Sequence, residues 1–105
     1  MIEYTAELYG SRSKKPTKTV FRAKNDENMR LRIIDEMKKA KKIRAKIYHY
    51  YVDNLGLPWF EEWEIITFKN GMFWAQSLHF DEPAHPIDPR TGKTISKGSA
   101  SPRKR

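Results

Sequence analysis

Residues 25–52, NDENMRLRIIDEMKKAKKIRAKIYHYYV, contain the change of hydrophobic period that decides the fold. In the first half of this stretch, Met29, Ile33 and Met37 recur every four residues, which predicts an amphipathic helix. From Ile43 onward the alternation has a period of two, which is typical of a β-strand. The stretch therefore predicts a helix that leads directly into a strand.

The outward face of this predicted strand grades from cationic to aromatic along its length. Its residues are Arg44, Lys46, Tyr48, Tyr50 and Val52, whereas Ile43, Ala45, Ile47, His49 and Tyr51 are expected to point inward. Cations next to aromatic rings can attract phosphates and stack on bases. Ordinary cross-strand packing is an alternative explanation for the tyrosines.

The predicted helix has charges that suit both of its ends. Asn25 or Asp26 is expected to cap the free amide groups at the start. The lysines between Lys38 and Lys42 crowd the last turn, where the helix dipole favours cations. Part of this basic cluster therefore has a structural explanation, and it can also be a solvated helix face.

Two hairpins flank the central stretch. Residues 2–9 alternate cleanly and residues 17–24 form a second predicted strand, so a polar loop at 10–16 makes a hairpin with a basic tip. Residues 62–68 and 72–80 flank Asn70-Gly71, the strongest short hairpin signal. A two-residue type I′ turn there sets Phe68 opposite Phe73. Alternation along the first of these strands places Glu62 and Glu64 on one strand face.

The expected architecture is a single α+β domain over residues 1–80. It has a mostly antiparallel sheet of about five strands, in the order β-β-α-β-β-β, with one helix packed on one face. From Asp81 periodicity stops and Pro and Gly are frequent, so residues 81–105 are predicted to be a flexible basic tail that contains Pro, Gly and Ser.

Composition narrows the possible chemistry of this 105-residue chain. It has no cysteine, which rules out disulfides and thiolate chemistry. It has no apolar run of membrane-spanning length, and its start lacks the features of a signal peptide, so a cytoplasmic protein without membrane attachment is expected. Its three histidines lack metal-ligand spacing, and we expect neither a metal, nor a cofactor, nor catalytic residues.

The positive charge is concentrated in the first half of the chain. The formal net charge is +8, yet the segment from Arg12 to Lys46 contains 14 basic and four acidic residues. A small domain this basic favours nucleic acid or an acidic protein surface as partner. We therefore expect a small non-enzymatic nucleic-acid-binding protein, for DNA or RNA. The candidate binding residues are Arg12, Lys14, Lys15, Lys18, Arg22, Lys38, Lys42, Arg44, Lys46, Tyr48 and Tyr50.

Two other functions stay open. The first is a protein-binding inhibitor or adaptor, of the kind that phages and mobile elements encode, which uses an aromatic hairpin with Trp59, Phe60 and Trp74 at the interface. For Trp74, burial in the core is the competing explanation. The second is a metal-free ribonuclease, which needs no motif detectable in a sequence.

Overall fold

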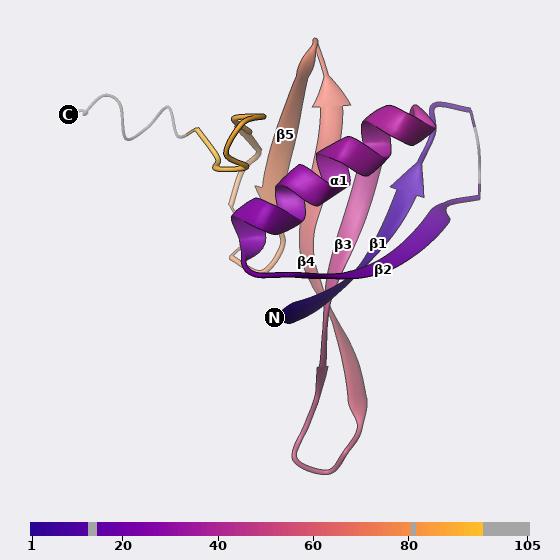
Figure 1. Cartoon of the computed structure of the whole chain (residues 1–105), viewed down its shortest axis with the longest axis vertical. Coiled ribbons are helices and arrows are strands. Elements are labelled where there is room, and N and C mark those ends of the chain that lie inside the picture. Colours follow the sequence, from indigo (N-terminus) through magenta and orange to yellow (C-terminus); the bar gives the residue numbers. More distant parts are fainter. Residues whose placement is uncertain (13–14, 81, 96–105) are drawn as a thin grey trace, which may run out of the picture.

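The computed structural model of the chain describes residues 1–12, 15–80 and 82–95. Its elements in chain order are β1 (Ile2–Tyr9), β2 (Thr17–Ala23), α1 (Asp26–Ala40), β3 (Arg44–Val52), β4 (Pro58–Lys69), β5 (Met72–Ser77) and β6 (His85–Pro86) (Figure 1). The predicted α+β class, with a single helix on one face of an antiparallel sheet, is confirmed. In the described part of the chain, α1 lacks the length and apolar character needed to span a bilayer.

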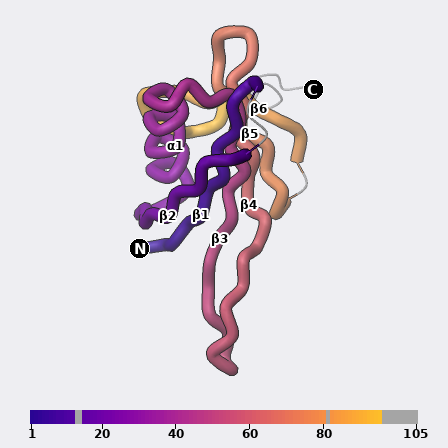
Figure 2. The backbone as a smooth tube through the Cα atoms, turned by 90° about the vertical axis from the view of Figure 1, so that its right-hand side faces the viewer, coloured from indigo at the N-terminus to yellow at the C-terminus, as the bar shows by residue number. Residues whose placement is uncertain are grey.

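The sheet has six strands in the order β2-β1-β3-β4-β5-β6, and every neighbouring pair is antiparallel. Strands β1 and β2 form the first hairpin. The chain then crosses the sheet through α1 and returns as β3, which pairs with the free edge of β1. Figure 2 shows α1 on one side of the sheet only. The opposite side, which we call the open face, carries no helix in the described residues.

Helix α1 begins and ends where the sequence predicts. The side chain of Asn25 accepts a hydrogen bond from the amide of Asn28 at 2.9 Å. At the other end, Lys41 adopts a left-handed conformation with φ of 55°, and its backbone N–H caps the last carbonyls. The predicted apolar stripe is buried, because Met29, Ile33 and Met37 all face the sheet.

The core lies between α1 and the covered face of the sheet. Its largest fully buried side chains are Tyr4, Leu8, Met29, Ile33, Met37, Ile47 and Ile66. The β4–β5 hairpin turns at Asn70 and Gly71, which both have positive φ (55° and 76°), as a type I′ turn requires. The resulting register pairs Phe68 with Phe73, as expected.

A β-bulge in β4 overturns one prediction about its acidic residues. The register between β3 and β4 shifts, so that Ile47 pairs with Glu64 and Tyr48 pairs with Glu62, which leaves Trp63 as an extra residue. Glu64 therefore points into the protein, whereas Glu62 lies on the open face. The expectation that the two glutamates share a strand face is wrong, because strict alternation does not hold through a bulge.

Strands β3 and β4 extend beyond their neighbours as a two-stranded ribbon. Pairing of β1 with β3 stops at Tyr50, and pairing of β5 with β4 begins only at Glu64. The residues beyond these limits project from one end of the sheet (Figures 1 and 2). We call residues 50–60 the finger.

The chain after β5 returns to the body of the domain. Strand β6 pairs with β5, Ile87 is only 2% exposed, and Arg30 Nη1 donates a hydrogen bond to the carbonyl of Gly92 at 3.0 Å. The prediction of a flexible tail from Asp81 onward needs correction for residues 82–95, since the pairing of β6, the buried Ile87 and the Arg30–Gly92 bond hold this segment without any periodic pattern. The rest of the predicted tail, residues 96–105, lies outside the described residues.

Candidate nucleic-acid interface

The open face displays the outward residues of each strand, charged and aromatic side chains among them. Alternation against the buried residues places Lys18 and Arg22 of β2, Glu3 and Glu7 of β1, and Lys46 and Tyr48 of β3 on this face. Cations and acids alternate across it, as in the pairs of Arg22 with Glu3 and Lys46 with Glu62. The strand face that the sequence singled out therefore stays uncovered, but much of its charge is balanced.

The first hollow on the open face lies beside Tyr48. Thr5, Glu7, Lys18, Tyr48 and Phe60 line a space of about 150 Å³. Tyr48 Oη donates a hydrogen bond to Glu7 Oε1 at 3.0 Å, and burial followed by this bond raises the pKa of Tyr48. A phosphate at this hollow would meet the Glu7 carboxylate.

Lys46, next to Tyr48, also has internal partners. Its Nζ lies 2.6 Å from Glu62 Oε2 and 5.5 Å from the centre of the Tyr48 ring. The hydrogen bond to Glu62 raises the pKa of Lys46, so the ammonium stays charged. Its charge is nevertheless matched by the carboxylate, which leaves Lys46 a weaker attractor for phosphate than an unpaired lysine.

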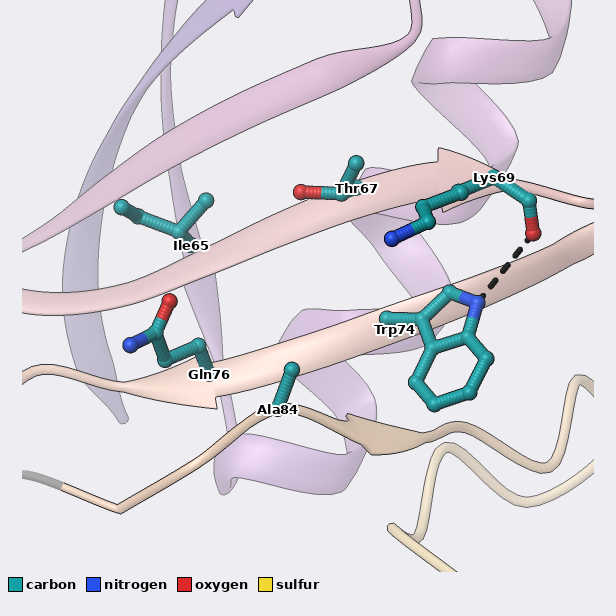
Figure 3. Close-up of a pocket in the computed structure, with 6 residues that line it drawn as sticks. All are labelled: Ile65, Thr67, Lys69, Trp74, Gln76 and Ala84. Carbon is teal, nitrogen blue, oxygen red and sulfur yellow. Dashed lines mark hydrogen bonds between the residues drawn. The ribbon is translucent and has the colours of Figure 1, made fainter.

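The second hollow lies beside Trp74, between β4, β5 and the segment before β6 (Figure 3). It measures about 240 Å³, and the described residues that line it are Ile65, Thr67, Lys69, Trp74, Gln76 and Ala84. None of these is acidic. The Trp74 indole N–H donates to the carbonyl of Lys69 at 3.2 Å, so the hydrogen bond fixes the ring as one wall of the hollow.

One end of the sheet gathers cations from segments that are distant in sequence. The amide of Ile43 donates to Tyr9 O at 2.9 Å, and the amide of Phe68 donates to Ile43 O at 2.8 Å. These bonds join the end of β1, the exit from α1 and the end of β4, at the end of the domain opposite the finger (Figure 1). We call this region the basic end, and its cations are Arg12, Lys15, Lys18, Lys38, Lys39, Lys41, Lys42, Arg44 and Lys69.

A groove with lysines on its rim crosses the basic end. Met37, Lys38, Lys41, Lys42, Ile43, Phe68 and Phe73 line a space of about 310 Å³ between the end of α1 and the β4–β5 hairpin. Lys38, Lys41 and Lys42 form no ion pair with any described residue. Lys39, by contrast, pairs with Asp35 at 3.0 Å. The groove thus combines a partly apolar floor with three ammonium groups that are free to meet an anion.

The structure brings some of the predicted binding residues together and separates others. At the basic end it places Arg12, Lys15, Lys18, Lys38, Lys42 and Arg44. Arg22 lies toward the far end of β2, Tyr50 packs on Phe60 at the base of the finger with ring centres 5.1 Å apart, and Lys46 and Tyr48 lie mid-sheet. Lys14 is outside the described residues.

The sequence-based set of binding residues omitted three cations of the basic end, namely Lys39 in the last turn of α1, Lys41 and Lys69. Lys41 follows the helix as its C-cap, and Lys69 precedes the Asn70-Gly71 turn. The turn signal and the alternation along β4 were sufficient to place Lys69 on the open face, but the long-range bonds that bring it to the basic end have no sequence signature.

The finger carries two of the three aromatic residues predicted for a protein interface. Trp59 and Phe60 are 50% and 58% exposed, and Leu55, Leu57 and Val52 are exposed beside them. Trp74, the third, lies on the open face instead. The finger and the Trp74 hollow are therefore separate surfaces.

A polar cluster joins the start of α1 to the bulged part of β4. Arg30 pairs with Glu64 through two bonds of 2.7 and 2.9 Å, and Asp26 Oδ1 accepts hydrogen bonds from Tyr4 and from the Trp63 indole. Burial raises the pKa of Glu64, although Arg30 opposes this shift. These partners satisfy one another, which indicates a structural role. Among the described residues, no group of His, Asp and Glu side chains is arranged to hold a metal ion.

Comparison with known proteins identifies no relative: no family model, no curated protein and no solved structure matches this chain. The function must therefore be argued from the arrangement of its own residues.

Proposed function

We propose that this chain is a small, non-enzymatic nucleic-acid-binding protein of the cytoplasm that contacts the phosphate backbone with its basic end. The observation that carries the proposal is the convergence of cations from the β1–β2 connection, the end of α1, the start of β3 and the end of β4. Folding concentrates charge that the sequence spreads over nearly sixty positions.

Unpaired cations matter most for this proposal. A protein that neutralises phosphates gains affinity by releasing counterions, and each contact adds about 0.7 to the log–log salt slope on single strands and about 0.9 on duplex DNA. Lys38, Lys41 and Lys42 have no acidic partner among the described residues. Lys46 would first have to leave Glu62. The basic end is therefore the better phosphate-binding surface.

The test is a salt titration of oligonucleotide binding, measured by fluorescence anisotropy. Replacing Lys38, Lys41 and Lys42 together by Gln should reduce the salt slope by about 2 on a single strand, as expected for three lost contacts. The matched control replaces Arg22, Lys24 and Lys93, which removes the same charge from outside the basic end. Equal effects of the two triple variants would contradict a defined site, and binding to an acidic protein alone would contradict the choice of ligand.

A second experiment addresses the absence of catalysis. Labelled RNA incubated with the protein, with and without Mg²⁺, should stay intact, because the proposed function involves no catalysis and Arg30, Glu64, Asp26 and Tyr4 of the polar cluster are engaged with one another. Cleavage that is lost in a His79→Ala or His85→Ala variant would favour the ribonuclease alternative.

A second candidate function is protein binding through the finger. The finger exposes Leu55, Leu57, Trp59 and Phe60 away from the core, and exposed aromatic residues of this kind often anchor protein interfaces. Affinity capture with the wild-type chain and with a Trp59→Ala/Phe60→Ala variant tests this function. A partner that binds directly in purified form, and only to the wild type, would establish it.

A further inference from the structure

We infer that the hollow beside Trp74 holds one unpaired nucleobase, so that the nucleic acid bound by this chain is single-stranded. This inference rests on the proposed function and adds to it a ligand class and a second contact site. The basic end provides attraction for phosphates of any strand, whereas the Trp74 hollow selects a base that is free of its pairing partner.

The lining of the hollow matches the chemistry of a base. The indole ring of Trp74 is a flat wall for stacking, and Ile65 adds apolar surface. Figure 3 shows the Gln76 amide, the Thr67 hydroxyl and the Lys69 ammonium on the same face. These three polar groups make no side-chain hydrogen bond or ion pair with the described residues, so they are available to base edges and to a phosphate. By contrast, the Trp74 N–H is already satisfied by Lys69 O.

The size of the hollow favours one ring over a larger ligand. Its volume of about 240 Å³ is below the range of about 300–1,000 Å³ typical of pockets for drug-sized molecules. A base in a duplex cannot enter such a site without leaving its stack, which costs a few kcal/mol. An unpaired base avoids most of this cost. The hollow should therefore prefer a single strand over a duplex.

Charge decides between the two hollows of the open face. Glu7 lines the hollow beside Tyr48 and accepts a hydrogen bond from that residue, so a nucleotide there would bring its phosphate toward a carboxylate. The described residues that line the Trp74 hollow are free of acids and include Lys69. The stacking position is therefore assigned to Trp74 and not to Tyr48.

The Trp74 hollow is also continuous with the basic end. Lys69 belongs to both, and Arg44 pairs in register with Thr67, which lines the hollow. A strand with one base against Trp74 can therefore place its neighbouring phosphates near Lys69 and Arg44. This path leads to the basic end without crossing Glu7 or Glu62.

The experiment compares an oligothymidylate of about 12 nucleotides with a duplex of the same length at about 50 mM salt. Trp74→Ala should weaken binding of the single strand about 5- to 150-fold, as expected for one lost base–aromatic stack. Trp74→Phe should keep most of the affinity because it retains a ring. The duplex should bind the wild type more weakly than the single strand and lose little in either variant. Trp59→Ala, on the distant finger, is the matched control and should bind like the wild type.

Tryptophan fluorescence gives a second measurement that does not depend on a destabilised variant. Stacking of a base should quench the emission of the wild type on titration with oligothymidylate, and Trp74→Phe should abolish this quenching while binding persists. Unchanged affinity in a folded Trp74→Ala variant, or quenching that survives in Trp74→Phe, would overturn the inference. Salt-dependent binding that still responds to the lysine variants would then leave the proposed function intact. If the wild type binds neither oligonucleotide, both this inference and the proposed function are wrong.

Discussion

Arg30 of α1 and Glu64 of β4, which are 34 positions apart, form a two-point ion pair inside the domain. Their contacts are 2.7 Å between Nε and Oε1 and 2.9 Å between Nη2 and Oε2, and their side chains are 11% and 4% exposed. Arg30 also donates to the carbonyl of Gly92. One guanidinium therefore ties together the helix, the sheet and the segment after β5.

Glu64→Gln should strongly destabilise the protein, because it leaves the Arg30 charge buried without its counter-ion. Breaking a buried pair in this way typically costs about 3–5 kcal/mol. Glu62→Gln is the matched control, since its pair with Lys46 lies on the exposed face and such pairs contribute about 1 kcal/mol or less. Urea unfolding of both variants checks this difference. Equal losses would mean that the Glu64 site is hydrated or relaxes around the neutral side chain.

The same glutamates show why sequence patterns predicted the elements better than the details. The periods of α1, the capping by Asn25 and the Asn70-Gly71 turn are local properties, so the sequence was sufficient to predict them. The bulge at Trp63 results from long-range packing of Trp63 against His49 and His79 and from its bond to Asp26, and none of these contacts has a local signature. An alternating pattern alone therefore placed Glu62 on the same face as Glu64, although the bulge turns Glu62 to the opposite side.

Gly92→Ala tests whether residues 82–95 belong to the folded domain. A Cβ at position 92 would clash with the carbonyl oxygen of Glu27, and the φ of 78° is already unfavourable for alanine. Gly56→Ala is the control, because Gly56 in the finger has a similar φ of 80° but nothing within 4 Å. The control should cost only about 1–2 kcal/mol of backbone strain, and Gly92→Ala clearly more, as measured by thermal unfolding. Equal costs would show that the segment separates from α1 without affecting the domain.

Tyr4 should make the protein sensitive to alkaline pH. Burial, followed by the hydrogen bond to Asp26, raises the pKa of the Tyr4 phenol above its usual range. The unfolded chain then loses this proton first, near pH 10, and the free energy of unfolding falls as the pH rises above that value. Tyr4→Phe removes the titrating group. The free energy of unfolding of this variant should therefore fall less between about pH 8 and about pH 11 than that of the wild type. Parallel losses in urea unfolding at the two values would contradict a role for Tyr4.

The candidate interface was only partly predictable for a related reason. The excess of positive charge and its position before residue 46 are properties of composition, and the cationic and aromatic face of β3 follows from alternation. Neither composition nor alternation predicts which of these side chains has an acidic partner, because Glu7 contacts Tyr48, and Glu62 contacts Lys46, from neighbouring strands. For Trp74 the sequence favoured burial in the core over an interface position, whereas the register of β4 and β5 sets it on the open face beside Lys69, Thr67 and Gln76.

The finger should loosen at low pH without unfolding the domain. Asp53 accepts hydrogen bonds from the Trp59 indole and from the amides of Leu55 and Leu57, and chiefly the Trp59 bond lowers the pKa of the Asp53 carboxyl. Because the folded value lies below the unfolded one, this stabilisation is fully present above about pH 4 and is lost as the pH falls through the folded pKa. The NMR shift of the Trp59 indole N–H should therefore titrate with a midpoint below about 3.9.

Asp53→Ala should abolish this titration. The Trp74 indole, which donates to a backbone carbonyl, should not titrate in this range and is the internal control. A Trp59 signal that stays constant as the pH is lowered would mean that the tip of the finger is not held by Asp53 in solution.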